Sequence, residues 1–194
     1  MDVAGRPWRL FIALPLPVEV AAAVVERLAA TRARHRDARW LPAQSLHLTL
    51  LFLGSTDPGH VDGLRAAVDE AAARQAAFTV ALGPGAGRAR RGHGVAWLSL
   101  AQGGRDTTEL ADRLAELVRP MGVGDARGPR RAPSAHLTVA RNATPDLLAD
   151  SLFAEAPHPP VTWRADRIVL FRSHLRPGGS VYEALHEATL AASS

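Results

Sequence analysis

The sequence contains no cysteine and no lysine among its 194 residues. Without cysteine there can be no disulfide bonds and no thiolate metal sites, which is consistent with a reducing compartment, so we expect a cytoplasmic protein. No apolar run approaches the roughly 20 residues that cross a bilayer, which argues against a membrane span. Residues 1–20 are interrupted by prolines and lack a small-residue cleavage site, so they predict a strand rather than a signal peptide.

Because lysine is absent, all 23 basic residues are arginines, against 19 acidic residues, and the formal net charge is +4. Arginine presents a planar fork of hydrogen-bond donors that matches phosphate, so the surplus is compatible with an anionic ligand. A solvated surface is the simpler explanation of so modest an excess. The arginines gather in residues 32–39, 88–93 and 127–131, where a basic rim would lie.

The length suits a single domain of ordinary size over residues 1–194, or two tightly joined halves. Apolar runs and helical periodicities alternate along the chain. Strands are expected at 8–14, 46–53, 78–82, 94–100, 135–140, 162–173 and 181–190, with helices at 18–36, from 57, from 106, and from 144 to 153. The glycine-rich stretch 83–94 predicts a loop. The central and closing strand pairs resemble hairpins, which favours an α+β fold with a mixed or antiparallel sheet.

Two short apolar stretches, HLTL and HLTV, each carry a histidine and a threonine two positions apart. Side chains alternate along a strand, so His47 and Thr49 share one face, and His136 and Thr138 do the same. A lone histidine in an apolar strand is usually only packed and hydrogen-bonded. A matched pair in one chain favours function, and if the two strands lie side by side their four polar groups converge on one hollow.

Two histidines without a carboxylate between them suit in-line displacement at phosphorus. An imidazole titrates near pH 6.5, so one ring acts as base toward the nucleophile while the other protonates the leaving oxygen. The hydroxyls of Thr49 and Thr138 can donate hydrogen bonds to the non-bridging oxygens, where charge accumulates. The residue types alone do not say which histidine is acid and which is base.

A metal site is the rival use of these histidines. A hydrolytic zinc usually takes three protein ligands, but neither stretch offers a third histidine or a carboxylate at matching parity. No HExxH motif occurs, and no acidic residue lies between His47 and Thr56. We therefore expect no metal and no cofactor. The other six histidines lie in polar or loop contexts without a partner motif.

At these residues the chain resembles the 2H phosphoesterase superfamily, which is named for two histidines in repeated His-x-Thr-x motifs. Within it, the sequence is similar to the bacterial RNA 2',3'-cyclic phosphodiesterases, also called 2'-5' RNA ligases. The likeness extends over RLFIALPLP, RWLPAQSLHLTLLFLG, HLTVAR and IVLFRSHLRPGGSVYEAL. The resemblance implies a bilobal α+β fold with pseudo-twofold symmetry, two sheets with helices outside, and one motif from each lobe in a central cleft.

The resemblance also implies metal-independent hydrolysis of a terminal 2',3'-cyclic phosphate to a 2'-phosphate, with possible reverse ligation. It suggests His47 as the proton donor to the 3' oxygen and His136 as the base. Arg141 matches an arginine that contacts phosphate in relatives, although on a straight strand it would point away from His136 unless the strand bends. Phe11 and Phe52 could stack on a nucleobase, but their apolar neighbours favour a core role.

Three alternatives concern the substrate and the class of protein. The partner is expected to be RNA with a cyclic phosphate end, or a related small cyclic nucleotide or 2'-5' oligonucleotide. A non-catalytic RNA-binding module that uses the arginine surplus would instead show salt-sensitive binding that does not depend on either histidine. Nothing in the sequence demands more than a monomer.

Overall fold

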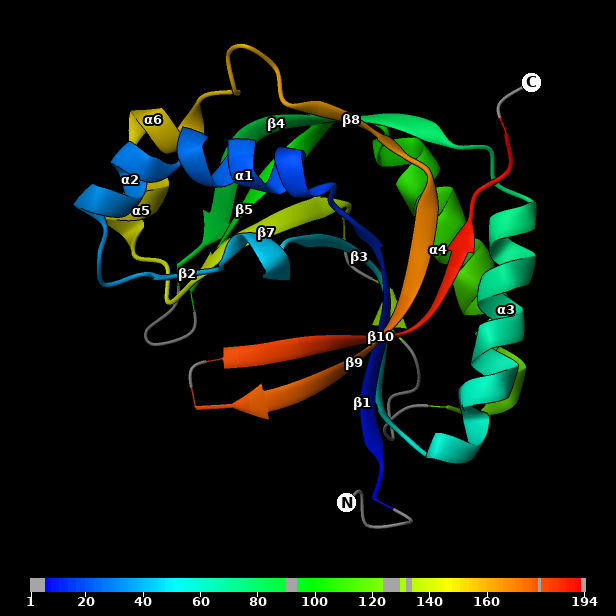
Figure 1. Ribbon diagram of the computed structural model, residues 1–194. Helices are drawn as coiled ribbons and strands as arrows, with labels where there is room; N and C mark the ends of the chain where they lie inside the picture. The colour runs from blue at the N-terminus through cyan, green and yellow to red at the C-terminus, as the bar shows by residue number, and fades with distance from the viewer. Residues whose placement is uncertain (1–5, 90–93, 124–129, 132–133, 178, 193–194) are drawn as a thin grey trace.

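The computed structural model describes residues 6–89, 94–123, 130–131, 134–177 and 179–192. Within these residues the strands form one curved antiparallel sheet with helices outside it (Figure 1). The strands are β1 (Trp8–Pro15), β2 (Arg39–Trp40), β3 (His47–Thr56), β4 (Phe78–Arg88), β5 (Val95–Gln102), β6 (Arg130–Arg131), β7 (His136–Arg141), β8 (Thr162–Ala165), β9 (Arg167–Arg176) and β10 (Gly179–Thr189). The predicted α+β class with an antiparallel sheet is confirmed.

The strand order is β10-β9-β1-β3-β7-β5-β4-β8, with β2 paired to β7 and β6 paired to β3. One half of the sheet therefore combines the first strands of the chain with the last two, and the middle of the chain builds the other half. The halves meet where β3 and β7 pair at Leu48 and Leu137. The two motif strands are thus central neighbours in one continuous sheet.

Helices cover the outer face of the sheet. The helices are α1 (Val18–Arg27), α2 (Ala29–Arg34), α3 (Val61–Ala73), α4 (Gly104–Val118), α5 (Pro145–Ala149) and α6 (Ser151–Ala154), with 3-10 turns η1 (Ala43–Ser45), η2 (Pro58–His60) and η3 (Arg119–Met121). Figure 1 shows α3 and α4 side by side; α3 packs on β9 and β10, and α4 packs on β3. Their apolar stripes, such as Leu64 and Val68 in α3, are fully buried. None of the described helices is long and apolar enough to span a membrane.

Four sequence expectations need correction. The strand expected at 162–173 divides at Asp166 into β8, which pairs with β4, and β9, which pairs with β1 and β10. The helix expected at 144–153 divides at Asp150 into α5 and α6. The helix expected at 18–36 is broken at Leu28 into α1 and α2. The loop expected at 83–94 is wrong in its first half, because β4 continues to Arg88; residues 90–93 lie outside the described part. The glycines serve close packing: a Cβ at Gly85 would overlap the carbonyl oxygen of Phe153, and one at Gly87 would overlap the side chain of Leu148.

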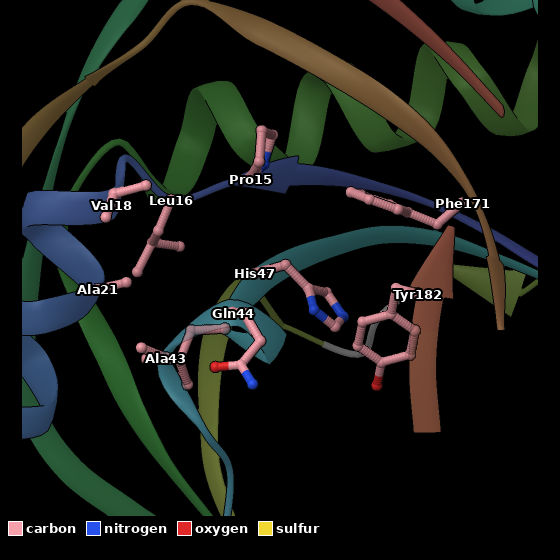
Figure 2. Close-up of a pocket in the computed structure, with 10 residues that line it drawn as sticks. Pro15, Leu16, Val18, Ala21, Ala43, Gln44, His47, Phe171 and Tyr182 are labelled. Atoms are coloured by element: carbon pink, nitrogen blue, oxygen red, sulfur yellow. The ribbon is translucent and has the colours of Figure 1, made fainter. Parts of the chain in front are cut away.

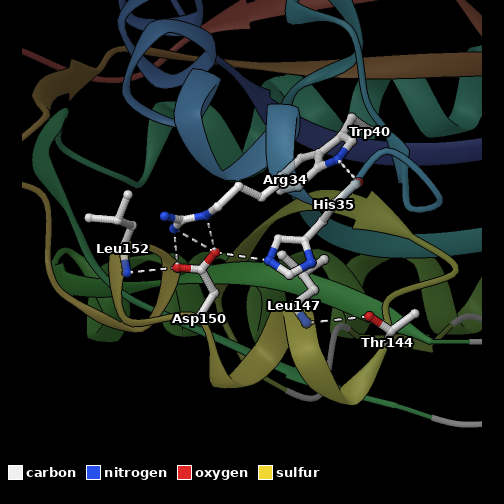
Figure 3. A network of polar contacts seen from close by, with 7 residues as sticks. All are labelled: Arg34, His35, Trp40, Thr144, Leu147, Asp150 and Leu152. Atoms are coloured by element: carbon white, nitrogen blue, oxygen red, sulfur yellow. Dashed lines mark hydrogen bonds and ion pairs between the residues drawn. The ribbon is translucent and has the colours of Figure 1, made fainter.

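An ion-pair network fastens α2 to the α5–α6 segment (Figure 3). The carboxylate of Asp150 accepts hydrogen bonds from Arg34, from Nε2 of His35 at 2.9 Å, and from the backbone N–H of Leu152 at the start of α6. These contacts hold the pKa of Asp150 below its ordinary value in spite of burial, which acts in the opposite direction. The network fixes the chain just before β2, which borders the second motif.

Candidate active site

The two motif histidines lie on the neighbouring strands β3 and β7. Because Leu48 pairs with Leu137 in antiparallel register, each motif histidine stands opposite the threonine of the other motif. His47 and His136 are therefore diagonal neighbours on one face, with Cβ atoms about 7–8 Å apart in regular pairing. The structure thus brings the two histidines and the two threonines together on one face of the sheet.

Both imidazole rings are held by the main chain in the same way. Nδ1 of His47 lies 2.9 Å from the carbonyl oxygen of Ser45, and Nδ1 of His136 lies 2.7 Å from that of Ser134. A carbonyl oxygen only accepts hydrogen bonds, so Nδ1 must carry the hydrogen in each ring. Nε2 is then the nitrogen left for chemistry, and it can accept or donate a proton at either histidine.

Each motif strand contains a β-bulge at the residue after its threonine. In β3 the register with β1 skips Leu50, and in β7 the register with β5 skips Val139. A bulge adds one residue to its strand and so reverses the facing of the residues beyond it. The carbonyl oxygen of Val139 accepts a hydrogen bond from the N–H of Leu41 at 2.8 Å, which satisfies the irregular backbone.

The bulges correct two expectations based on straight strands. Phe52 was expected on the core face with Leu50, but it is 46% exposed and lies on the histidine face. On a straight strand Leu51 would share the face of His47 and Thr49, but it is fully buried. Arg141 is exposed and turned back onto the face of His136, as a bend at the strand end would require.

The electrostatics of His47 also place it near Arg141. Burial lowers the pKa of His47 to about 4, while its hydrogen bond to Ser45 acts in the opposite direction. The positive charges of Arg141 and His136 lower this pKa further, so both groups lie within interaction range of the His47 ring. His47 is accordingly neutral at pH 7 in the unliganded protein.

Aromatic rings pack against one side of the His47 imidazole. The ring of Phe11 lies 4.9 Å from the imidazole between centroids, and Tyr182 meets it edge-on at 5.2 Å. Phe11 also stacks on Phe171 at 5.2 Å. Phe11 is only 6% exposed, so it is a buried residue that packs against the imidazole of His47. On the other motif, Trp97 lies 5.3 Å from the ring of His136.

A pocket of about 310 Å³ opens beside His47, between α1, η1 and β10. Figure 2 shows the imidazole between the side chains of Gln44 and Tyr182, with Leu16 reaching into the same space. The pocket walls are mostly apolar, and the amide of Gln44 is an exposed polar group at the rim. Such a pocket, apolar with a few polar groups, suits a flat organic ring next to a charged group.

The structure can be compared with two further ideas from the sequence, a metal site and a basic rim of arginine clusters. Among the described residues, no group of three or more histidine, aspartate or glutamate side chains could hold a metal ion. Of the three arginine clusters, residues 32–39 are described in full. Those at 88–93 and 127–131 fall largely outside the described residues.

A family model for the 2'-5' RNA ligase superfamily matches residues 16–177. The chain belongs to this superfamily. It is 34% identical to an RNA 2',3'-cyclic phosphodiesterase of Thermus thermophilus, covering 94% of this chain and 90% of that protein. A second RNA 2',3'-cyclic phosphodiesterase, from Thermotoga maritima, is 26% identical over 92% of this chain and 94% of its own.

Two solved structures share the fold of this chain. A protein of Thermus thermophilus superposes with a TM-score of 0.74 at 30% identity, covering 96% of this chain and 100% of that one. Escherichia coli LigT in complex with 3'-AMP gives a TM-score of 0.71 at 26% identity, with 96% and 99% covered. The family and fold expected from the repeated motifs are confirmed.

Several residues of this superfamily member's cleft could not be identified from the sequence. Phe171 and Tyr182 reach His47 only because β9 pairs with β1, two strands more than 150 residues apart in the chain. Trp97 reaches His136 through the pairing of β5 with β7. Gln44 precedes the first motif without any pattern of its own. Only the order of strands in the sheet assigns these residues to the cleft.

Proposed function

We propose that the protein hydrolyses the 2',3'-cyclic phosphate at the end of an RNA chain to a 2'-phosphate, using His47 and His136 as acid and base. One observation carries the proposal: the Nδ1 atoms of both histidines are tied to main-chain carbonyls, which leaves both Nε2 atoms available on one face of the sheet. The naming of two relatives as RNA 2',3'-cyclic phosphodiesterases supports the same substrate.

The reaction follows from this geometry in one displacement. Nε2 of His136 takes a proton from water as the water oxygen bonds to phosphorus. The bond from phosphorus to the 3' oxygen breaks, and the protonated Nε2 of His47 donates its proton to that oxygen. A 2'-phosphate and a free 3' hydroxyl result. Acid and base assistance each contribute about 10²–10⁴ in rate, without requiring a metal ion.

The acid role of His47 depends on the substrate itself. In the free protein the pKa of His47 lies at about 4, so the ring carries no proton to donate at pH 7. A bound phosphodiester places a negative charge beside the ring, and an opposite charge at that distance raises the pKa of a histidine. Binding of the anion therefore recruits the proton that the leaving oxygen later receives.

Charge that develops on the phosphate is met by three further groups. The hydroxyls of Thr49 and Thr138 donate hydrogen bonds to the non-bridging oxygens, and the guanidinium of Arg141 neutralises their charge. The terminal nucleoside occupies the pocket beside His47, against Tyr182. Phe52, exposed on the same face, offers a stacking surface for a base, whereas Phe11 supports the ring of His47 from below.

The same residues can also catalyse ligation, with a hydroxyl group in place of water as the nucleophile. If a 5' hydroxyl of a second RNA takes the place of water at His136, attack on the cyclic phosphate produces a 2'-5' linkage. Water at its ordinary concentration competes strongly with a bound hydroxyl end, so we expect ligation to be weak beside hydrolysis. The superfamily name refers to this reaction.

The test is a product analysis in the presence of EDTA. Wild-type protein is incubated with an oligoribonucleotide that ends in a 2',3'-cyclic phosphate, and the end group is identified as cyclic, 2'-phosphate or 3'-phosphate. We expect a 2'-phosphate from the wild type. We expect a rate at least about 100-fold lower from His47→Ala and from His136→Ala, because each removes one proton-transfer group.

A matched control is His186→Ala, because His186 pairs with Asp69 of α3 at 2.7 Å on the outside of the sheet. This variant should retain the wild-type rate. Absence of a 2'-phosphate product, or full activity in either motif variant, would contradict the proposed function. Retained RNA binding with no turnover in the wild type would favour the binding-module alternative instead.

A further inference from the structure

Arg39 in β2 lies directly opposite Arg141 in β7. Side chains directly opposite each other in an antiparallel pair point to the same face of the sheet, with Cα atoms about 4.5–5.5 Å apart. Since the bulge in β7 turns Arg141 onto the histidine face, Arg39 lies on that face as well. The cleft therefore has two neighbouring arginines beside the motif histidines.

No acidic group neutralises this arginine pair within the described part of the chain. Both side chains are exposed, and neither makes an ion pair with a described residue. Like charges directly opposite each other in a sheet destabilise it, so the folded protein retains an unrelieved repulsion at this position. A ligand with two negative charges would convert the repulsion into attraction at both arginines.

The local structure holds Arg39 firmly although β2 has only two residues. The indole N–H of the next residue, Trp40, donates to the carbonyl oxygen of His35 at 2.9 Å. The N–H of Leu41 donates to the bulge residue Val139 at 2.8 Å. The backbone that carries Arg39 is thus joined on one side to the Asp150 network and on the other to the strand of the second motif.

The guanidinium of Arg39 reaches the tip of the β9–β10 hairpin. A Cβ built on Gly179 would lie 3.3 Å from one of its terminal nitrogens. Figure 1 shows this hairpin projecting on the side of the molecule that carries β2. Arg141 thus lies within interaction range of His47, and Arg39 reaches the hairpin tip at Gly179.

We propose that Arg39 binds the phosphate on the 5' side of the terminal nucleotide, next to the cyclic phosphate held by Arg141. The inference rests on the proposed function and adds a distinction between substrates to it. A nucleoside 2',3'-cyclic phosphate has no phosphate at this place, whereas the end of an RNA chain always has one. Arg39 therefore favours chain ends over free cyclic mononucleotides.

The experiment compares two substrates that differ by one phosphate: adenosine 2',3'-cyclic phosphate and its 5'-phosphorylated form. For the wild type, kcat/KM should be higher with the 5'-phosphate. Arg39→Ala should lower kcat/KM for the 5'-phosphorylated substrate about tenfold, the effect of one hydrogen bond to a charged group, and leave the other substrate unchanged. Arg39→Lys should restore part of the preference, because it keeps the charge without the fork.

Salt dependence gives a second readout on a short RNA that ends in a cyclic phosphate. Loss of one phosphate contact should reduce the slope of log KM against log salt by about 0.7 in Arg39→Ala. Arg36→Ala is the matched control: it removes the same charge three residues away, from an exposed side chain that bonds to the carbonyl oxygen of Ala33 in α2. This control should keep the wild-type preference and slope.

The outcomes separate this inference from the proposed function. If Arg39→Ala changes both substrates equally or neither, or if Arg36→Ala has the same effect, the assignment of Arg39 is wrong while the phosphodiesterase activity stands. If the wild type converts neither substrate nor the RNA, the proposed function fails and the inference fails with it. Thermal unfolding of each variant shows that the folded protein is being compared.

Discussion

Phe52 and Arg141 occupy equivalent places in the two halves of the cleft. Each stands two residues beyond a bulge, and each is turned by that bulge onto the histidine face. The two motifs are thus alike in their histidines, threonines and backbone irregularity, and they differ where one presents an aromatic ring and the other a cation. Under the proposed function, this difference would give the cleft one side for bases and another for phosphates.

Replacement of Arg141 by alanine should raise the pKa of His47, because the positive charge of Arg141 lowers it in the wild type. NMR titration of the His47 ring measures this directly. The same variant should lose about 10²–10³ in kcat/KM, typical for one group that stabilises a developing anion. Arg141→Lys keeps the charge and should leave the His47 pKa low. An unchanged pKa in Arg141→Ala would place the guanidinium outside the cleft.

The two phenylalanines of the cleft should respond differently to truncation. Phe52→Ala removes an exposed ring, so we expect a change in stability below about 1 kcal/mol and a KM for RNA at least about fivefold higher, since stacking on one base contributes about 1–3 kcal/mol. Phe11→Ala removes a ring that is 6% exposed and should cost about 3 kcal/mol in the free energy of unfolding. Urea denaturation and initial rates measure both. Equal losses of stability would contradict the bulge in β3.

The helices and most of the strands could be predicted from periodicity and from turn residues. Leu64 and Val68, for example, mark the buried side of α3, whereas Gly54, expected to close the strand 46–53, lies within β3, which continues to Thr56. The bulges could not be predicted, because neither Leu50 nor Val139 is a glycine or any other residue that marks an irregular strand. Strict alternation of side chains along each strand predicts the wrong face for every residue beyond the bulge, and Phe52 is one of these residues.

The residues of the candidate site that belong to the repeated His-x-Thr motif could be predicted from the sequence. His47 and His136 stand out because one motif occurs twice, and the meeting of β3 and β7 makes the repeat a single site. Arg39 has no repeat and lies among other arginines, so only its pairing with Arg141 distinguishes it. Residues brought into the cleft by pairing between distant strands leave no local pattern in the sequence.

Stability should fall in mild acid because of His47. Its pKa is about 4 in the folded protein and 6.5 ordinarily, so between these values the unfolded chain binds the proton more readily. From pH 7 to pH 4 this one group should reduce the free energy of unfolding by up to about 3 kcal/mol. Denaturant titrations give the free energies of unfolding of the wild type and of His47→Gln at each pH. The difference between the two free energies should be constant above pH 6.5 and change below it. Parallel pH curves would mean that His47 is not held neutral.

Packing of α6 on β4 can be tested with two glycines. Gly85→Ala should destabilise the protein by about 2 kcal/mol or more, because the new methyl group would overlap the carbonyl oxygen and ring of Phe153. Gly104→Ala is the control: nothing lies within 4 Å of its Cβ position at the start of α4, and it should stabilise by about 0.5–1 kcal/mol. Thermal melts of the two variants should shift in opposite directions. A neutral Gly85→Ala would contradict the close approach of α6.

Both ends of the polypeptide contribute to the same half of the sheet, and this bears on biosynthesis. A ribosome completes β3 and β7, with both motif histidines, before it reaches β9 and β10, which bring Phe171 and Tyr182 to His47. The nascent chain therefore carries both motif histidines well before the strands that supply Phe171 and Tyr182 to the pocket beside His47 have been made. Only after β10 has been added can that pocket take its final form.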